Sequence, residues 1–465
     1  MITLPFSNCR HDGFRPHTRL FCDYPAGSGF GYALRVNVDG QMATLNLPIN
    51  GEPFGYDYPV VTAVGGAGAK DANTDGGQVL RVDGTSLGPA TLPMGSIFPT
   101  PVRVFYGGAD ATVYEAVDCR MVAAGTAGAA LLQTNIVCET APGTGRGHAL
   151  AVEVAGRRSE VPFVNQPDGL TYGAPVLASF SSPADAPAGS NVVSAADTAG
   201  QEEILINGRN FGEWTERIMV QFFKQISLPL VSDGSAGSGA LTASQADRIR
   251  FLPETGSCVV TVPHRQISCI MGQGAGNALD WMVQVDGLNS SNPVTAYSPP
   301  VISSVHPVGA LSSPVSPQGL SSEGGVRLSI SGRYFGPSGS SFNGNPGLVQ
   351  RIAYAVGGVT LAGQFDNETA STSTGQSYAP VTFSVVSHNR IDVTLPPSIG
   401  TGHCFGLLVA DQEAIEDPAT QPDARCFDFA LPEITSLTPR RAPTDPNGAT
   451  MVIQGTNLGL RDPIA

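Results

Sequence analysis

The residues Gly84-Thr-Ser86-Leu-Gly88 spell the Gly-x-Ser-x-Gly pattern of a hydrolase nucleophile elbow. Such an elbow needs a strand, a sharp turn and a helix, so that the serine hydroxyl stands exposed above a sheet. Three similar stretches elsewhere in the chain carry Asn210, Tyr334 and Asn457 in place of this serine. Because those stretches lack a nucleophile, Ser86 is predicted to be a turn residue.

A second chemical signal is the acidic stretch Asp71-Ala-Asn73-Thr-Asp75-Gly76. Alternate oxygen side chains followed by glycine resemble the first half of a calcium loop. The twelfth position is Val82, however, where such a loop has a bidentate glutamate. The pattern therefore favours an Asx-rich turn, with calcium bound by Asp71, Asn73 and Asp75 as the alternative.

The remaining catalytic signals are weak. The Gly-x-Gly-x-Gly stretches precede strand-like residues and not a helix, so they do not form the phosphate site of a helix N-terminus. The seven histidines have no recurring carboxylate or nucleophile beside them and are predicted to be surface or structural residues: His11, His17, His148, His264, His306, His388 and His403. We therefore expect no enzyme activity and no cofactor.

A long repeat provides the main evidence on the fold. Four segments run from an apolar strand into Gly, two variable residues, an apolar residue and Gly again. Their first glycines are Gly84, Gly208, Gly332 and Gly455, at separations of 208 − 84 = 124, 332 − 208 = 124 and 455 − 332 = 123 residues. A constant period of this kind is the sequence signature of an array of repeated units.

Each repeat contains several short apolar segments with period-two alternation, the pattern of strands that bury one face. A lead-in strand precedes each glycine signature, at residues 59–64, 175–180, 300–305 and 432–437. Further strands follow at residues 102–106, 218–223 and 352–356. Short strands, Gly-rich turns and the lack of helical periodicity predict two-sheet sandwiches.

The set of motifs resembles the IPT/TIG family of immunoglobulin-like domains. A representative copy has the lead-in strand starting at Pro175, then Ile206-Asn-Gly208-Arg-Asn-Phe211-Gly212, then Ile267-Ser-Cys269 before a Val-x-Val strand. This resemblance implies an all-β fold of tandem immunoglobulin-like β-sandwiches in an elongated array. The family occurs in plexin-type receptors, transcription factors and bacterial and algal surface proteins, and beside catalytic domains of polysaccharide enzymes.

The repeat predicts five units along the chain. Residues 1–57 form the C-terminal part of a module, residues 58–173, 174–298 and 299–431 form whole modules, and residues 432–465 form the N-terminal part of another. Two explanations of this layout stay open. The chain is a window of a longer array, or part-modules of successive subunits complete one another.

The eight cysteines divide into two per unit, which favours one disulfide inside each. The predicted pairs are Cys9/Cys22, Cys119/Cys138, Cys258/Cys269 and Cys404/Cys426. Eight buried thiols are the alternative. Four disulfides would place the chain in an oxidising compartment, outside the cell or at its surface.

Two sequons, Asn289-Ser-Ser291 and Asn367-Glu-Thr369, are candidate sites for covalent glycans. The formal net charge is −14, with 25 Lys and Arg residues against 39 Asp and Glu, and no basic run that could neutralise phosphates. Nucleic acid and anionic membranes are therefore not expected as partners. No apolar stretch is long enough for a transmembrane helix, so no membrane insertion is expected in this segment.

These observations predict an extracellular structural protein, a subunit of a surface fibre assembled head to tail, whose partners are copies of itself or adjoining modules of a longer chain. One alternative is the ectodomain of a receptor or adhesin that binds protein or glycan. Another is the accessory region of a polysaccharide-active enzyme.

Overall fold

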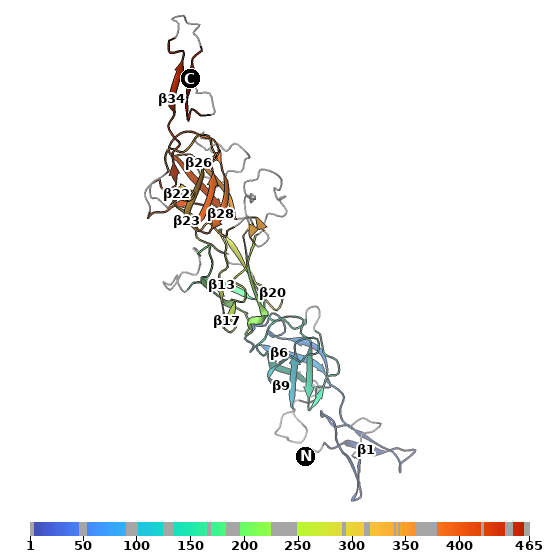
Figure 1. Cartoon of the computed structure of the whole chain (residues 1–465). Coiled ribbons are helices and arrows are strands. Elements are labelled where there is room, and N and C mark those ends of the chain that lie inside the picture. The colour runs from blue at the N-terminus through green and yellow to red at the C-terminus, as the bar shows by residue number, and fades with distance from the viewer. Residues whose placement is uncertain are drawn as a thin grey trace.

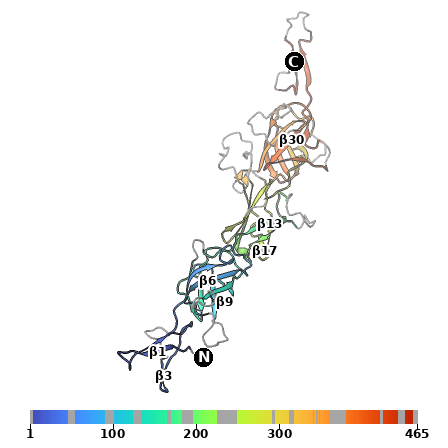
Figure 2. The same cartoon turned by 180° about the vertical axis from the view of Figure 1, so that it is seen from behind.

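The computed structural model describes residues 4–45, 54–89, 101–123, 134–164, 169–182, 196–224, 249–290, 294–310, 317–338, 341–342, 345–346, 348–358, 379–419, 423–441 and 450–459. Within these residues the secondary structure consists of strands and one 3-10 turn, η1 (Thr215–Arg217). The sandwiches follow one another along a rod, with β1 and β34 at opposite ends (Figure 1). The view from behind shows the same order of sandwiches (Figure 2). The predicted all-β fold of tandem immunoglobulin-like sandwiches is confirmed.

The first whole module contains two four-stranded sheets. One has the order β5-β6-β10-β9 and the other β12-β11-β7-β8. The first consists of β5 (Val60–Gly65), β6 (Val79–Thr85), β9 (Val117–Ala123) and β10 (Thr134–Glu139), and the second of β7 (Val102–Tyr106), β8 (Tyr114–Glu115), β11 (Leu150–Val154) and β12 (Arg157–Arg158). Alternate apolar residues of both sheets, such as Val82, Val104 and Ile136, are fully buried. Burial of each such side chain stabilises the module by about 1.5–3 kcal/mol.

The second whole module repeats this plan. Its sheets have the orders β13-β14-β18-β17 and β16-β15-β19-β20, with β21 also pairing β19. The strands are β13 (Val176–Ser181), β14 (Glu203–Arg209), β15 (Ile218–Lys224), β16 (Ile249–Phe251), β17 (Val259–Val262), β18 (Gln266–Ile270), β19 (Leu279–Val285), β20 (Leu288–Asn289) and β21 (Val294–Thr295). Trp281 of β19 is fully buried and its ring stacks on Phe222 of β15.

The third whole module has the same central strands with additions at the edges. Its sheets have the orders β28-β29-β23-β22-β32 and β27-β26-β30-β31, with β33 pairing β30 and a separate hairpin β24-β25. The strands are β22 (Val301–Pro307), β23 (Arg327–Arg333), β24 (Ser341–Phe342), β25 (Asn345–Pro346), β26 (Val349–Val356), β27 (Ala379–Pro380), β28 (Thr382–Ser387), β29 (Arg390–Thr394), β30 (His403–Val409), β31 (Gln412–Glu413), β32 (Ile415–Glu416) and β33 (Cys426–Phe427). The parallel pairing of β22 with β32 extends the first sheet.

The glycine signature is a turn at the end of the second strand of each unit. Ser86, Asn210, Tyr334 and Asn457 all have positive φ, between 56° and 65°. The next residue, such as Phe211 or Phe335, is buried in the whole modules, as the sequence predicts. Ser86 lies in a bend directly after β6, so the prediction that it is a turn residue is confirmed. That it is not a nucleophile stays a prediction.

The two ends of the rod are part-sandwiches. Residues 4–57 contain the hairpins β1 (Ser7–His11) with β2 (Leu20–Asp23) and β3 (Leu34–Val38) with β4 (Gln41–Leu45), and residues 432–459 contain β34 (Glu433–Thr438) with β35 (Val452–Thr456). Most side chains of these strands are exposed, in contrast to their counterparts in the whole modules. No second sheet covers the apolar faces of these end strands among the residues that the structure describes.

Candidate functional site at the module joints

The cysteines pair as predicted. The structure forms the disulfides Cys9–Cys22, Cys119–Cys138, Cys258–Cys269 and Cys404–Cys426. Cys9–Cys22 links the neighbouring strands β1 and β2. Cys119–Cys138 links β9 to β10, and Cys258–Cys269 links the residue before β17 to β18; both lie in the sheet that contains the glycine signature of their module. The fourth links β30 to β33 in the opposite sheet, which explains why its second cysteine comes late in the module. Loops of 11–22 residues closed in this way contribute about 2–4 kcal/mol each to the free energy of unfolding.

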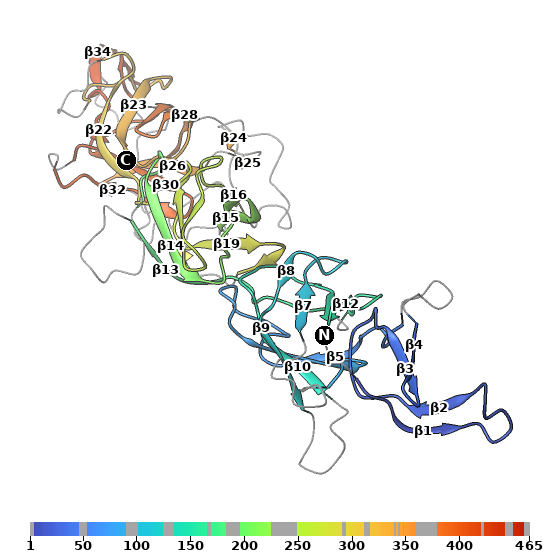
Figure 3. The same cartoon turned by 90° about the horizontal axis from the view of Figure 1, so that it is seen from below.

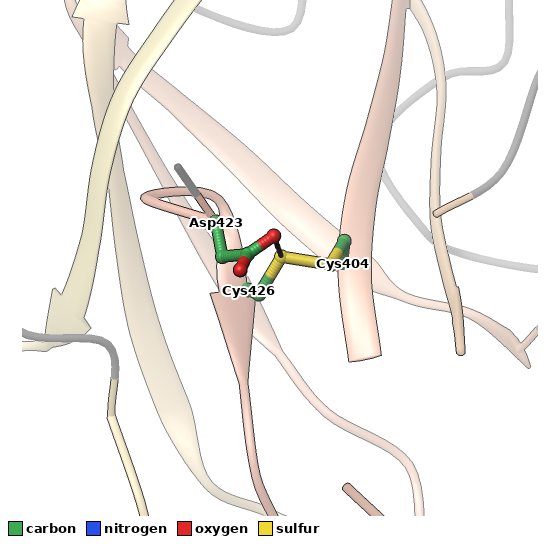
Figure 4. A group of neighbouring side chains, drawn as sticks. All are labelled: Cys404, Asp423 and Cys426. Atoms are coloured by element: carbon green, nitrogen blue, oxygen red, sulfur yellow. Dashed lines mark hydrogen bonds between the residues drawn. A yellow bond between two sulfur atoms is a disulfide. The ribbon is translucent and has the colours of Figure 1, made fainter. Parts of the chain in front are cut away.

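The fourth disulfide has a carboxylate beside it. Cys404, Asp423 and Cys426 place their sulfur and oxygen atoms within 4.8 Å of one another (Figure 4). Metal ions bind the thiolate form of cysteine, and both sulfur atoms are engaged in the disulfide here. This group is therefore a disulfide with an acidic neighbour and does not offer a set of metal ligands.

The predicted calcium residues lie where the first whole module meets the second. The Asp75 carboxylate accepts a hydrogen bond from Arg265 of the next module, with 2.6 Å between Oδ2 and Nη2. The backbone N–H of Asp71 donates to Thr171 Oγ1. The Asn73 N–H donates to Gln78 Oε1. The loop thus belongs to a contact between modules, and calcium binding stays a prediction.

Asn289, the acceptor residue of the first sequon, is exposed and ends β20. Its Oδ1 atom accepts a hydrogen bond from Gln284 Nε2 at 2.8 Å. The second sequon residue, Asn367, lies outside the described residues. Glycosylation of both stays a prediction.

We name the joints by the modules they connect. The N-terminal joint lies between residues 1–57 and 58–173, the first joint between 58–173 and 174–298, the second joint between 174–298 and 299–431, and the C-terminal joint after residue 431.

All four joints repeat one contact. A residue from the loop before the Val-x-Val strand packs on the last glycine of the next unit's signature. The pairs are Ser28 with Gly88, Thr144 with Gly212, Ala275 with Gly336, and Ile399 with Gly459.

The joint contact explains the second glycine of the signature. Gly212 has φ = 71°, and a Cβ atom there would lie 2.5 Å from Thr144 Cγ2 of the preceding module. A Cβ atom at Gly88 would likewise lie 2.8 Å from Ser28 Cβ. Glycine is thus required both by the left-handed backbone and by the approach of the neighbouring module.

Two histidines repeat a second contact, which the sequence interpretation missed. His264 Nδ1 lies 2.9 Å from Thr74 Oγ1 at the first joint, and His388 Nδ1 lies 3.3 Å from Thr198 Oγ1 at the second. The sequence contained a sign of this contact. The two histidines are 388 − 264 = 124 residues apart and the two threonines 198 − 74 = 124 residues apart, which is the period of the repeat. His264 and His388 are therefore joint residues.

A polar network holds the first joint. Arg217 Nη1 donates to Asp286 Oδ2 at 3.0 Å within the second module. The same nitrogen donates to Thr144 Oγ1 and Tyr114 OH of the first module, both at 3.2 Å. Thr144 Oγ1 also donates to Asp286. The side chains of Arg217 and Asp286 remain about one third exposed, at 36% and 29%.

The second joint is more deeply buried. Ala275 of the second module belongs to one continuous apolar cluster with Leu348 and Ala410 of the third. Beside it, Lys224 Nζ lies 3.3 Å from Asp411 Oδ2 of the third module, and the two side chains are only 6% and 14% exposed. The first whole module has a separate apolar cluster. Among the described residues, the buried apolar side chains of the second and third modules thus form one cluster, whereas those of the first module form a cluster of their own.

No family model matches this sequence, and no curated protein matches it. Among solved structures, the Yersinia pseudotuberculosis adhesin InvE is 11% identical, with a TM-score of 0.25 over 51% of this chain and 58% of its own. The bacterial integrin-binding protein invasin is 11% identical, with a TM-score of 0.21 over 82% of this chain and 61% of its own. Sidekick-1 immunoglobulin domains 1–5 are 10% identical, with a TM-score of 0.17 over 89% and 71%. The chain therefore spans little more than half of the length of the InvE structure, and its function must be inferred from its own geometry.

Proposed function

We propose that this chain is an extracellular structural protein of IPT/TIG-type modules, the subunit of a surface fibre that assembles head to tail. The observation that carries the proposal is the joint contact, repeated at all four joints of an unbranched rod. A repeated joint fixes the same relation between successive modules, which suits a load-bearing filament. The four disulfides fit an oxidising compartment, and among the described residues no helix is long and apolar enough to cross a bilayer.

The two ends supply complementary strands for such assembly. In the first whole module β10 pairs β6 with Ile136 opposite Val82, and both residues are fully buried. Leu20 precedes Cys22 by two residues, as Ile136 precedes Cys138. Ile453 precedes Gly455 by two, as Val82 precedes Gly84. Leu20 and Ile453 are 45% and 49% exposed.

Pairing β35 of one copy with β2 of the next would restore the four-stranded order β34-β35-β2-β1. Heterologous contacts of this kind, which do not close into a ring, generate filaments. The paired strands β3 and β4 would contribute to the second sheet of this composite. Adjoining modules of a longer chain are the other partners that could cover these faces.

Electron microscopy of the purified protein tests the proposal. We expect fibres with a constant axial repeat. Ile453→Asp should weaken end-to-end association at least about tenfold, because a carboxylate replaces an apolar side chain that assembly buries. Val161→Asp is the matched control, since Val161 is 78% exposed and lies outside the strands. Single rods at every protein concentration would exclude the fibre.

A binding function is the second candidate, because one module exposes an aromatic residue that its siblings lack. Trp214 is 54% exposed, and the corresponding position of the third module, 214 + 124 = 338, is a serine. The other tryptophan, Trp281, is buried, so a ligand at this surface should change the fluorescence of Trp214. An adhesin would show saturable binding to a glycan or protein that Trp214→Ala abolishes.

A further inference from the structure

Lys224 is unusual in this chain by residue type and by position. The chain has 25 basic residues, and only Lys70 and Lys224 are lysines. Lys224 is 4% exposed, at the end of β15, where it pairs with Leu279 of β19. An arginine would serve as well or better in an ion pair, since its guanidinium stays charged and binds carboxylates bidentately. A lysine amine, in contrast, can act as a nucleophile.

Two groups with complementary chemistry lie next to the Lys224 amine. Its Nζ atom is 3.2 Å from Oδ1 of Asn277, in the loop before β19. It is 3.3 Å from Oδ2 of Asp411, which follows β30 in the third module. Figure 3 labels β15 and β19 in the second module and β30 in the third, the two modules that this joint connects. An amine, an amide carbonyl and a carboxylate therefore meet at the second joint.

The surroundings fix the carboxylate and leave its side chain only 14% exposed. Gln350, 3% exposed, donates from Nε2 to Asp411 Oδ1 at 2.9 Å and accepts from the Asp411 N–H. The other carboxylate oxygen is left facing Lys224. The lysine side chain passes Gly276, where a Cβ atom would lie 3.4 Å from Lys224 Cδ. Groups held together in this way react as if at very high concentration.

We propose that Lys224 and Asn277 form an intramolecular isopeptide bond, with Asp411 as the proton carrier. Asp411 takes a proton from the Lys224 ammonium, and the neutral amine attacks Cγ of Asn277 to form the new C–N bond. The carboxyl group of Asp411 then donates its proton to the amide nitrogen of Asn277 and accepts one from the former amine. The old C–N bond breaks, and one molecule of ammonia leaves.

The bond has a structural consequence that depends on the joint. It links the end of β15 to the loop before β19, two segments 53 residues apart, and thereby closes one end of the second module. Because Asp411 belongs to the third module, the bond forms only when that module is seated. The corresponding trio is missing from the first joint, where Gly108, Arg146 and Gly287 stand at these positions.

Amine labelling of the denatured full-length protein tests the bond, since the chain has just two lysines. Lys70 should react with an amine-specific reagent, while Lys224 should remain unlabelled. The intact reduced protein should be lighter than its sequence by the mass of one ammonia. After trypsin, a branched peptide should join residues 218–248 to residues 266–327, which separates the bond from ammonia loss at a succinimide.

Variants identify the role of each group. Asp411→Asn keeps the shape of the site without its proton carrier, and Lys224 should then become fully labelled. Asn277→Ala should have the same effect, whereas Lys70→Arg should leave the branched peptide unchanged. A free amine on Lys224 in the unmodified protein overturns the proposal. A branched peptide that carries Asp411 in place of Asn277, with loss of one water, overturns the assignment of the acceptor.

Discussion

The first and second joints share one backbone geometry but differ in the chemistry around it. The first places Thr144 on Gly212 and surrounds this contact with the partly exposed network of Arg217 and Asp286. The second places Ala275 on Gly336 within a continuous apolar cluster and buries a single ion pair beside it. The comparison teaches that the repeat specifies how modules meet, while a few side chains decide how firmly they are held.

The largest expected effect comes from breaking the buried pair of the second joint. Asp411→Ala removes the carboxylate beside Lys224 and, on the proposal above, also prevents the bond to Asn277. The Lys224 ammonium then stays buried and unpaired, which should lower the free energy of unfolding by about 3–5 kcal/mol. Asp75→Ala removes the partner of Arg265 at the first joint, where the side chains are 40% and 57% exposed, and should cost about 1 kcal/mol or less. Denaturant unfolding of both variants measures the difference. Equal losses would contradict the ranking of the joints.

Adding a methyl group to Gly212 at the first joint should cause the next largest loss in the free energy of unfolding. Gly212→Ala combines a left-handed backbone with a Cβ atom 2.5 Å from Thr144 Cγ2. Gly77→Ala is the matched control, because Gly77 has φ = 74° and no atom within 4 Å of a Cβ there. The collision should make Gly212→Ala about 1–3 kcal/mol more destabilising than its control.

The same substitution at the second joint sharpens this comparison. A Cβ atom at Gly336 would lie 3.5 Å from Ala275 Cβ, which is ordinary contact. Gly336→Ala should therefore cost little more than Gly77→Ala, and small-angle scattering should show a bent or loosened rod for Gly212→Ala alone. A rod of unchanged dimensions in Gly212→Ala would mean that the contact does not set the angle between modules.

The sequence predicted the tandem sandwich fold and missed the contacts between modules, for a physical reason. Strand alternation and the Gly-x-x-Phe-Gly turn are local patterns, so residues such as Phe211 and Phe335 revealed the sandwiches. The disulfide pairs followed from counting two cysteines per unit. Joint residues such as Thr144 and Ala275 vary in type, because what they share is a position against another module's glycine.

The trio at the second joint could not have been predicted from the sequence. Lys224, Asn277 and Asp411 come from two modules, and no spacing rule brings a lysine of β15 next to an aspartate that follows β30. The contacts between histidine and threonine at the joints, in contrast, could have been predicted. His264 and His388 are separated by the repeat period, as are Thr74 and Thr198, so a comparison of polar residues at that period would have revealed both pairs.

A rise in salt concentration should weaken the first joint and leave the second unaffected. Raising the salt concentration from about 0.05 M to about 1 M shortens the screening length to about 3 Å, which weakens the partly exposed pair of Arg217 and Asp286. Hydrogen exchange should then increase a few-fold in peptides that cover the first joint, consistent with a loss of about 1 kcal/mol or less. Peptides that contain Lys224 or Asp411 should exchange at an unchanged rate, because their pair is shielded from the solvent. A salt-independent first joint would show that Thr144 packing holds it, and not the charges.

The smallest expected effect is a dependence of the first joint on pH, through His148. This ring donates a hydrogen bond from Nε2 to the Thr144 carbonyl oxygen at 2.9 Å. The corresponding residue of the second module is Leu279. Burial lowers the pKa of His148 below its ordinary value. As the pH falls below about 6.5, His148 is therefore protonated in the unfolded chain before it is protonated in the folded one. Stability is unaffected above that pH, decreases as the pH falls below it, and stops decreasing below the lowered pKa of the folded state.

His148→Leu gives the first joint the residue of the second and should flatten this acid-side slope, measured as the melting temperature of the first module between neutral and mildly acidic pH. His388→Gln is the control, because it removes a histidine whose pKa is also lowered by burial but which lies at the second joint. It should leave the slope of the first module unchanged. If His148→Leu keeps the full slope, the proton is taken up elsewhere, and the two joints do not differ in their response to acid.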